Sequence, residues 1–255
     1  MKKNFHSACI LLLFVLTGCS IDDADKKPSV YSNNLVLGAS ARDFLSDETF
    51  TRIELDVVYV MGHKPEDQVL QSLTNFLERY THKPGGISLK TRAIVSPQMG
   101  SYSIKEIKTV EKQHRSVFSE DDKLGVFIFF ADNKSEDSKA NFRILGKAYL
   151  NTSLVIFDNQ ELSDMTGSVS KNDIQTVTLH HEFGHLFGLV NNGSPAQSEH
   201  EDPDKGSRAH CSVDGCLMAA AIEFSSSPLR FLENDQNILD FDEQCKLDLK
   251  ANGGK

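Results

Sequence analysis

The segment "IQTVTLHHEFGHLFGLV" (residues 174–190) combines the periodicity of an apolar helix with the spacing of a metal site. His181 and His185 are four positions apart, so a helix projects both imidazoles from one face, close enough to reach a single ion. The residues around them are apolar, and buried histidines without partners would be costly to desolvate. Glu182 lies beside the first histidine, where it is placed to act as a general base. We therefore predict a zinc site, because zinc suits imidazole donors.

Gly188 follows the second histidine by three residues and completes the motif HEFGHLFG. Glycine tolerates positive φ, so the chain can turn sharply out of the helix there and bring a later segment beneath the metal. The motif resembles that of the metzincin metalloproteases. His180 has Gly184, not a histidine, four positions further on, so we expect His180 to be an exposed neighbour outside the site.

The third metal ligand does not stand at the usual metzincin position. In that pattern it follows the glycine by three residues, a position that Asn191 holds here, and a neutral amide is a poor zinc donor. Two later histidines are His200 and His210. His210 opens "HCSVDGCLM", which resembles the archaemetzincin segment in which the third ligand precedes CxxxxCxM, here with residues 191–209 inserted before it. The resemblance implies His210 as the third ligand, with His200 as the alternative.

Acidic residues of the same region are further alternatives. Glu201 or Asp202 could bind the metal directly or orient one of its ligands. A glutamate as third ligand, from Glu199, Glu201 or Glu223, is disfavoured because Gly188 belongs to the histidine-type pattern.

Met218 and the two cysteines that precede it, Cys211 and Cys216, extend the archaemetzincin likeness. The resemblance implies that Met218 lies in the Met-turn, a tight turn packed under the metal site. That family also has a second pair of cysteines completing a four-cysteine structural zinc, which this chain lacks, so no second zinc is predicted. In an exported protein, Cys211, Cys216 and Cys245 indicate one disulfide and one remaining thiol. Cys211 and Cys216 are the favoured pair because they are near in sequence, and the other pairings stay open.

The chain begins with a segment typical of a secretory signal. Two lysines precede an apolar run over residues 10–16, which is too short to span a bilayer of ~30 Å. The run ends in Leu-Thr-Gly-Cys, which resembles the lipobox of bacterial lipoproteins and implies lipidation of Cys19 after cleavage of residues 1–18. We expect residues 19–34 to form a flexible tether and residues 35–255 to form a single domain, exported and held by the lipid at a membrane of the cell envelope.

The composition argues against some classes of partner. The 255 residues include 36 Asp and Glu against 27 Lys and Arg, which gives a formal net charge of −9. Loss of Lys2 and Lys3 with the signal makes the charge more negative. This balance argues against nucleic acid or an anionic lipid surface as a binding partner. It selects neither a substrate nor an oligomeric state.

The periodicity of the chain predicts an α/β (α+β) fold in the order β-α-β-α-β-β-β before the helix that carries the histidines. Residues 124–131 are continuously apolar, as a strand covered on both faces should be, and Ser103 and Glu106 form a capping-box pattern. The strands are expected at residues 51–62, 87–95, 124–131, 144–150 and 153–159, and the helices at residues 64–80, 103–118, from 172 or 173 to 190, and 234–249.

Over nearly the whole mature chain, the sequence resembles lipid-anchored "membrane metalloproteases" of Bacteroidetes. The likeness rests on the segments FLSDETFTRIELDVVYV, KPGGI, HEFGHLFGLVNNGSP, HCSVDGCLM and DLKANGG. It implies a zincin-like fold with a mixed twisted sheet, an active-site helix, a Met-turn and a C-terminal helix. It also implies a Zn²⁺ peptidase acting on a peptide or protein substrate. Asp22, Asp23 and Asp25 resemble the acidic stretch that accompanies cell-surface display in that phylum.

Two functions are consistent with these residues. The first is a zinc metallopeptidase, with an endopeptidase as the preferred kind. It has three histidine ligands, an open position for water and Glu182 as general base. In the second, a surface lipoprotein or adhesin binds zinc without hydrolysis through a closed set of four histidines, His181, His185, His200 and His210. Glu182 favours the enzyme, because a purely structural site has no use for a carboxylate beside its first ligand.

Overall fold

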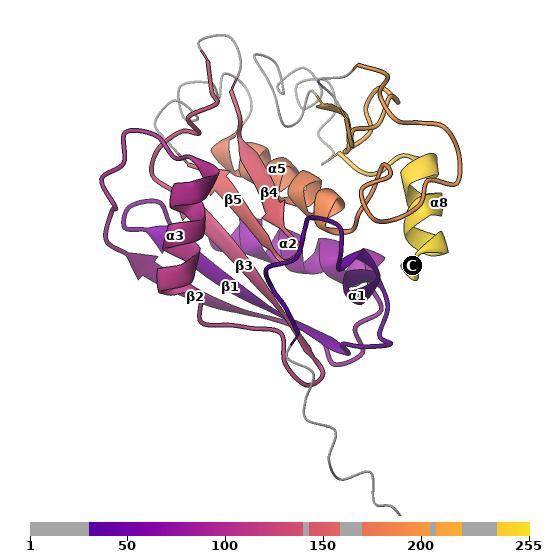
Figure 1. Cartoon of the computed structure of the whole chain (residues 1–255), viewed down its shortest axis with the longest axis horizontal. Helices are drawn as coiled ribbons and strands as arrows, with labels where there is room; N and C mark the ends of the chain where they lie inside the picture. Colours follow the sequence, from indigo (N-terminus) through magenta and orange to yellow (C-terminus); the bar gives the residue numbers. More distant parts are fainter. Residues whose placement is uncertain (1–30, 140–142, 159–169, 205–207, 221–238) are drawn as a thin grey trace, which may run out of the picture.

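The computed structural model describes residues 31–139, 143–158, 170–204, 208–220 and 239–255. Cys19, Glu223 and residues 234–238 of the expected C-terminal helix lie outside these ranges. Strands and helices alternate along much of the chain (Figure 1). In order, the elements are α1 (Ala41–Leu45), β1 (Arg52–Val60), α2 (Asp67–Tyr80), β2 (Ile87–Ile94), α3 (Ile104–His114), β3 (Lys123–Ala131), β4 (Gly146–Leu150), β5 (Ser153–Phe157), α5 (Lys171–Leu186) and α8 (Glu243–Ala251).

The strands form one five-stranded mixed sheet in the order β2-β1-β3-β5-β4. β1 is parallel to β2 and β3, and β3 is parallel to β5, whereas β4 runs antiparallel to β5 at the edge. The chain moves one way along the sheet from β1 to β2 and the other way from β2 to β3. Right-handed crossovers therefore place α2 and α3 on opposite faces of the sheet (Figure 1). The predicted mixed α/β fold is confirmed.

The central strand β3 is buried on both faces, as its continuous apolar sequence predicted. Ile128 and Phe130 face the core that contains α2 and α5, and Phe127 and Phe129 face the smaller core under α3. This alternation follows from the two-residue period of a strand. The sheet is thus packed between two apolar layers, and α5 lies in the larger one.

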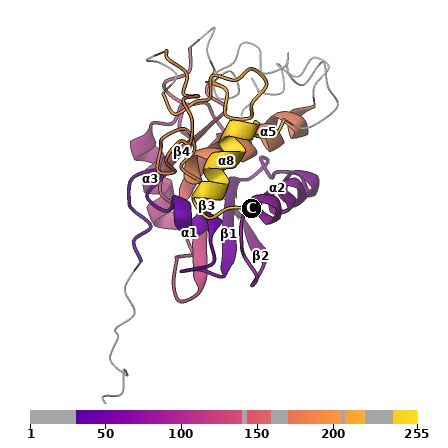
Figure 2. The same cartoon turned by 90° about the vertical axis from the view of Figure 1, so that its right-hand side faces the viewer.

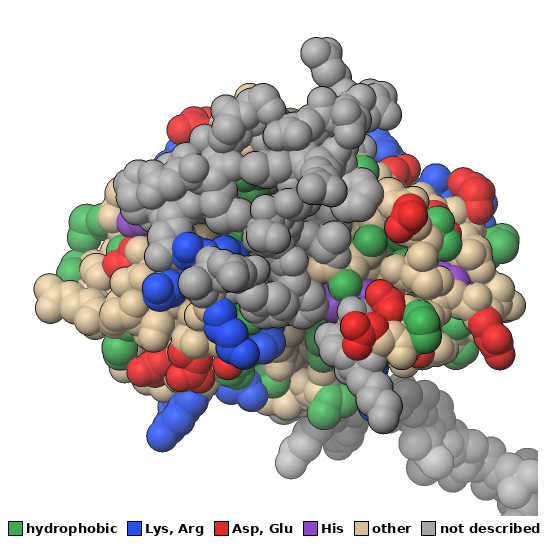
Figure 3. All heavy atoms as spheres, turned by 90° about the horizontal axis from the view of Figure 1, so that it is seen from above, with side chains coloured by type: hydrophobic (Ala, Val, Ile, Leu, Met, Phe, Trp, Pro, Cys, Tyr) green, Lys and Arg blue, Asp and Glu red, His purple; other side chains and the backbone are tan. Residues whose placement is uncertain are grey.

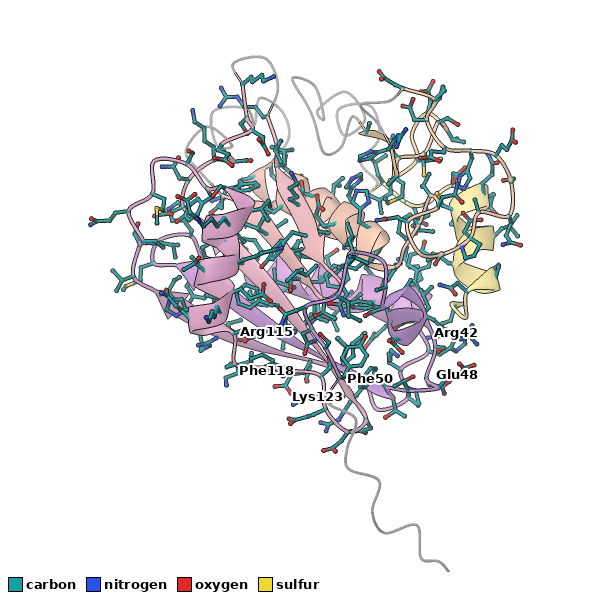
Figure 4. All side chains as sticks on the ribbon, in the orientation of Figure 1. Arg42, Glu48, Phe50, Arg115, Phe118 and Lys123 are labelled. Carbon is teal, nitrogen blue, oxygen red and sulfur yellow. The ribbon has the colours of Figure 1, made fainter. Side chains whose placement is uncertain are left out.

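Both ends of α3 are held by side chains. Ser103 N donates to Glu106 Oε2 at 2.7 Å and Glu106 N donates to Ser103 Oγ at 3.3 Å, which confirms the capping box. At the other end, Arg115 lies where α3 meets the sheet (Figure 4). Its buried guanidinium donates to Glu111 Oε1 at 2.7 Å and to Gly125 O at 2.8 Å. These bonds join the helix to the first half of β3.

Several elements differ from the sequence expectation, including α3 and α5, which end at His114 and Leu186 instead of residues 118 and 190. Residues 31–34 pack on the domain instead of ending the tether, because Asn33 Nδ2 donates to Thr152 Oγ1 at 3.0 Å. The C-terminal helix begins only at Glu243, where Asp242 caps it. The short helix α1 was not expected, since five residues are too few to show a helical period. The Asn33 contact joins residues that are distant in sequence, whereas the cap of the C-terminal helix and the helix α1 depend on only a few neighbouring residues.

Lys83 is a buried cation that donates from Nζ to the backbone carbonyls of Asp43, Ser46 and Phe50. Lys83→Met keeps most of the aliphatic length but removes the donor, so we expect the free energy of unfolding to fall by about 1–3 kcal/mol. Urea unfolding should show a lower midpoint at an unchanged slope. The exposed Lys105→Met is the control. Equal midpoints for the two variants would show that the three bonds do not stabilise the fold.

The surface around the C-terminal segments is acidic. Figure 3 shows Asp and Glu side chains prominent on the right, the side of the molecule that carries residues 190–204, residues 208–220 and α8. The exposed acidic residues there include Glu199, Glu201, Asp204, Asp214 and Glu243. An approaching ligand therefore meets a negative potential on this side.

Within the described ranges, none of the helices has the length and apolar character needed to cross a bilayer.

Candidate metal centre

α5 carries the first two histidines in its buried part. Ser170, and not Asn172 or Asp173, caps the helix, because its Oγ accepts from Asp173 N at 3.1 Å. The Nε2 atoms of His181 and His185 lie 3.1 Å apart. Two nitrogens bound at ~2.0–2.1 Å to one tetrahedral zinc ion would be separated by about 3.4 Å. The helix therefore holds this pair close to the spacing of two ligands on one ion.

The sharp turn expected after the motif is confirmed. α5 ends at Leu186, and Gly188 has a φ of +71°. A Cβ on this glycine would lie 2.7 Å from Ser194 N and 2.8 Å from Ala41 Cβ, so the position has room only for glycine. The chain leaves the helix at this turn, and a later part of the segment that follows comes back to α5.

His210 is brought to α5 by a backbone pairing within the returning segment. Residues 200–202 form an antiparallel bridge with residues 210–212. The ring centroid of His210 lies 5.3 Å from that of His181 and 5.0 Å from that of His185. One ligand nitrogen from each of the three histidines lies within 4.8 Å of the others. Figures 1 and 2 show this segment on the same side of the molecule as α8.

The histidines of α5 are in the protonation state that binds a metal. Burial, together with neighbouring imidazoles, lowers the pKa of His181 to about 3 and the pKa of His185 well below its ordinary value. Backbone carbonyls face two Nδ1 atoms, with Leu217 O 2.7 Å from His181 and Arg208 O 3.1 Å from His210. A proton on each Nδ1 leaves Nε2 with a lone pair for a metal. The donor set therefore fits an ion that prefers imidazole.

Glu182 lies between α5 and the edge strand β4. It is fully buried, and its Oε2 accepts from Ala148 N at 2.7 Å. Gly146 makes room for the carboxylate, since a Cβ there would lie 2.8 Å from Glu182 Oε1. β4 thus fixes a carboxylate next to the histidine pair.

Met218 packs against the turn of α5 between the two histidines. It is fully buried, and a Cβ on Gly184 would lie 2.2 Å from its sulfur. Cys211 N donates to Met218 O at 2.8 Å, which closes the residues between them into a loop. Leu217, whose carbonyl faces His181, belongs to the same loop. The loop therefore supports α5 at the position where the resemblance implied a Met-turn.

The alternative third ligands lie elsewhere. Asn191 is exposed, and its Nδ2 donates to Glu201 Oε2 at 3.4 Å. His200 lies in a separate group of side chains, with Cys211, Asp242 and Cys245. In the part of the chain that the structure describes, the closed set of four histidines is therefore not assembled.

The expectation that His180 is exposed is wrong. Only 4% of its surface is accessible, and its ring stacks on Phe76 with centroids 4.1 Å apart. Burial lowers the pKa of His180 to about 4, so it is a neutral core residue. Phe183, three residues further on in the helix, and Phe187, at its C-cap, are also buried. Their helical spacing from His180 was the signal for this position.

The expected disulfide between Cys211 and Cys216 is also wrong. Both of these cysteines and Cys245 are buried free thiols. Cys216 Sγ lies 3.7 Å from Cys245 Sγ. Nearness in sequence was misleading because the loop between the first two cysteines turns both sulfurs toward the third.

Comparison with known proteins yields similar structures only. No family model matches the chain, and none of the curated proteins does. It is similar to an archaemetzincin from Methanopyrus kandleri, with 18% identity, a TM-score of 0.48, and coverage of 79% of this chain and 96% of that one. A zinc-dependent peptidase from Methanocorpusculum labreanum has 15% identity and a TM-score of 0.45, covering 76% and 99%. Metalloproteinase-II from Bacteroides fragilis has 13% identity and a TM-score of 0.43, covering 81% and 55%. At these values, the function must be argued from the chain's own residues.

Proposed function

We propose that this chain is a zinc-dependent peptidase whose metal is held by His181, His185 and His210. The observation that carries the proposal is the convergence of three buried imidazoles with a buried carboxylate, Glu182, fixed beside them. Three imidazole ligands leave a tetrahedral ion one open position, which is the arrangement of a catalytic site and not of a structural one.

Zinc held by these histidines would supply a Lewis acid for the scissile carbonyl and would make water acidic enough to react near neutral pH. Glu182 takes a proton from the attacking water and gives it to the leaving amine. The backbone amide of Ala148 supports this role, because it holds one carboxylate oxygen and so limits the orientations of the side chain. The loop of Met218 supports the helix that presents both groups.

The edge strand β4 favours cleavage within a chain. Among the described residues its backbone pairs with β5 on one side and with no strand on the other, and it lies directly beside Glu182. An extended peptide can add to such an edge through main-chain hydrogen bonds. A substrate bound in this way extends past the site in both directions. We therefore infer an endopeptidase.

The proposal is tested with residues 20–255 and a peptide library whose amino and carboxyl ends are both blocked. We expect cleavage that a zinc chelator abolishes and added zinc restores. Cleavage of unblocked peptides alone would identify an exopeptidase. A zinc-loaded protein that cleaves neither library would contradict the peptidase and favour the zinc-binding surface protein.

We also propose that lipid on Cys19 anchors the protein to a membrane of the cell envelope. The support is the sequence of residues 1–19, which has the lysines, the short apolar run and the Leu-Thr-Gly-Cys of a lipoprotein signal. Each acyl CH₂ buried in the bilayer adds ~0.8 kcal/mol to membrane binding. Mass spectrometry of the amino-terminal peptide of the exported protein tests this proposal, and an unmodified Cys19 would contradict it.

Gly146→Ala is expected to lower peptidase activity without removing the metal. The new methyl group would lie 2.8 Å from Glu182 Oε1 and 2.7 Å from Thr178 Cγ2, so the carboxylate must shift. Displacing a catalytic group by about 1 Å can lower the rate by about 10²-fold. Gly100→Ala, where a methyl group meets no atom within 4 Å, is the control. Equal kcat/KM in the two variants would show that the position of Glu182 does not limit hydrolysis.

A further inference from the structure

Three thiols and one imidazole converge at a second point, separate from the three histidines. Cys211 Sγ lies 3.5 Å and Cys245 Sγ 3.8 Å from His200 Nδ1, and the Sγ atoms of Cys216 and Cys245 are 3.7 Å apart. With Zn–S of ~2.3 Å and Zn–N of ~2.0–2.1 Å, tetrahedral ligands are separated by about 3.8 Å for two sulfurs and about 3.6 Å for sulfur and nitrogen. The three observed separations are close to those of ligands on a single zinc ion, and Cys216 joins the group through its contact with Cys245.

The four side chains come from three parts of the chain. His200 lies in the segment inserted after α5, Cys211 and Cys216 flank a short loop, and Cys245 lies in the first turn of α8. Each of the four residues is 2% exposed or less. Polar groups are rarely gathered in a core without a partner that compensates for their desolvation.

Backbone amides are directed at two of the sulfurs. Val213 N donates to Cys211 Sγ at 3.5 Å, and Met218 N donates to Cys216 Sγ at 3.3 Å. Asp242 N also donates to Cys216 Sγ, at 3.5 Å. N–H donors stabilise negative charge on sulfur, and the thiolate is the form that binds zinc.

Asp248 fixes the orientation of the His200 ring. Its Oδ2 lies 2.9 Å from His200 Nε2, and its Oδ1 accepts from Gln197 N at 2.7 Å. A carboxylate on one ring nitrogen, with the other nitrogen facing the metal, is the usual support of a zinc-binding histidine. A carboxylate oxygen of Asp242 lies within 4.8 Å of the ligand atoms of His200, Cys211 and Cys245. Asp242 is nevertheless a weaker candidate for fourth ligand than Cys216, because its Oδ1 already accepts from Cys245 N as the cap of α8 and zinc favours the softer thiolate.

We propose that Cys211, Cys216, Cys245 and His200 bind a second, structural zinc ion, with Asp248 as the residue that positions the histidine. The sequence pattern predicted no such ion, because the second cysteine pair of the four-cysteine site is missing. The inserted segment supplies a histidine in its place. Four protein ligands close this site to water, so it stabilises the fold and does not react. Its first cysteine directly follows the third histidine of the candidate catalytic site, and the ion therefore fixes that segment.

The decisive experiment uses residues 20–255 and does not depend on hydrolysis. The double variant His181→Ala, His185→Ala lacks the first site, and after purification with zinc and reductant we expect it to retain one zinc ion per chain, against two in the wild type. X-ray absorption at the zinc edge of this variant should show three sulfur ligands and one nitrogen. Zinc content of zero, zinc without sulfur ligands, or a Cys216–Cys245 disulfide found by mass spectrometry would overturn the proposal.

Single substitutions in the same background separate the ligand from its positioning residue. Asp248→Asn keeps all four ligands, and we expect its zinc affinity to fall by about 10–100-fold in competition with a chelator, with three sulfurs still bound. His200→Ala should weaken affinity further and remove the nitrogen from the absorption spectrum. The exposed His82→Ala is the matched control. Equal zinc affinity in all three variants would refute the assignment of His200 and Asp248. A wild type that holds both zinc ions and cleaves nothing would support the second zinc site and contradict the proposed peptidase.

Discussion

Glu182→Gln is expected to keep zinc at the three histidines and to lower kcat/KM by about 10²–10⁴-fold, the usual contribution of a general base. Glutamine has nearly the same shape as glutamate, and its carbonyl oxygen can still accept from Ala148 N as Glu182 Oε2 does. The amide cannot take a proton from water at neutral pH, so binding and chemistry should separate in this variant.

The measurement combines zinc content with the rate of cleavage of one end-blocked peptide. Glu78→Gln is the matched control, because it neutralises an exposed carboxylate on α2, away from the three histidines, and should leave the rate unchanged. If Glu182→Gln held its zinc and cleaved as fast as wild type, another group would have to be the base. If it lost its zinc, the carboxylate would be a structural support of the site.

His210→Ala should produce the second large effect, because it removes one of three metal-binding nitrogens. The remaining pair on α5 binds zinc more weakly, and we expect a loss larger than the ~10–100-fold that follows removal of a residue behind a ligand. Hydrolysis should fall with zinc occupancy. Chelator competition, read together with peptidase rate, measures both effects.

His200→Ala is the informative comparison for this prediction. His200 lies with the three thiols, so its loss should leave zinc at His181 and His185, while His210→Ala should remove that zinc. The opposite result, with hydrolysis and the first zinc lost only in His200→Ala, would move the third ligand to His200. The exposed His82→Ala controls for loss of a surface histidine.

The features predicted well from the sequence are those that depend on neighbours along the chain. The spacing of His181 and His185 placed both on one face of a buried helix, and Gly188 marked the turn that ends it. The continuous apolar run of β3 predicted a strand covered on both faces. Local periodicity carries these signals because each depends on contacts within a few residues.

The parts that could not be predicted depend on contacts between distant segments. The place of His200 is set by Asp248 on α8, and no local pattern links the two residues. The cysteines were paired by nearness in sequence, whereas the fold brings Cys245 close to Cys216 from the last helix. His180 is a different case, because its spacing to two phenylalanines already indicated a buried face.

The most direct test of the zinc-peptidase account is an anomalous difference map at the zinc edge, from crystals of residues 20–255 grown with zinc. The account predicts a peak ~2.0–2.1 Å from the Nε2 atoms of His181, His185 and His210, with water as the fourth ligand on the side of Glu182. A map with no peak among these histidines, or with a fourth protein ligand closing the position, would contradict it.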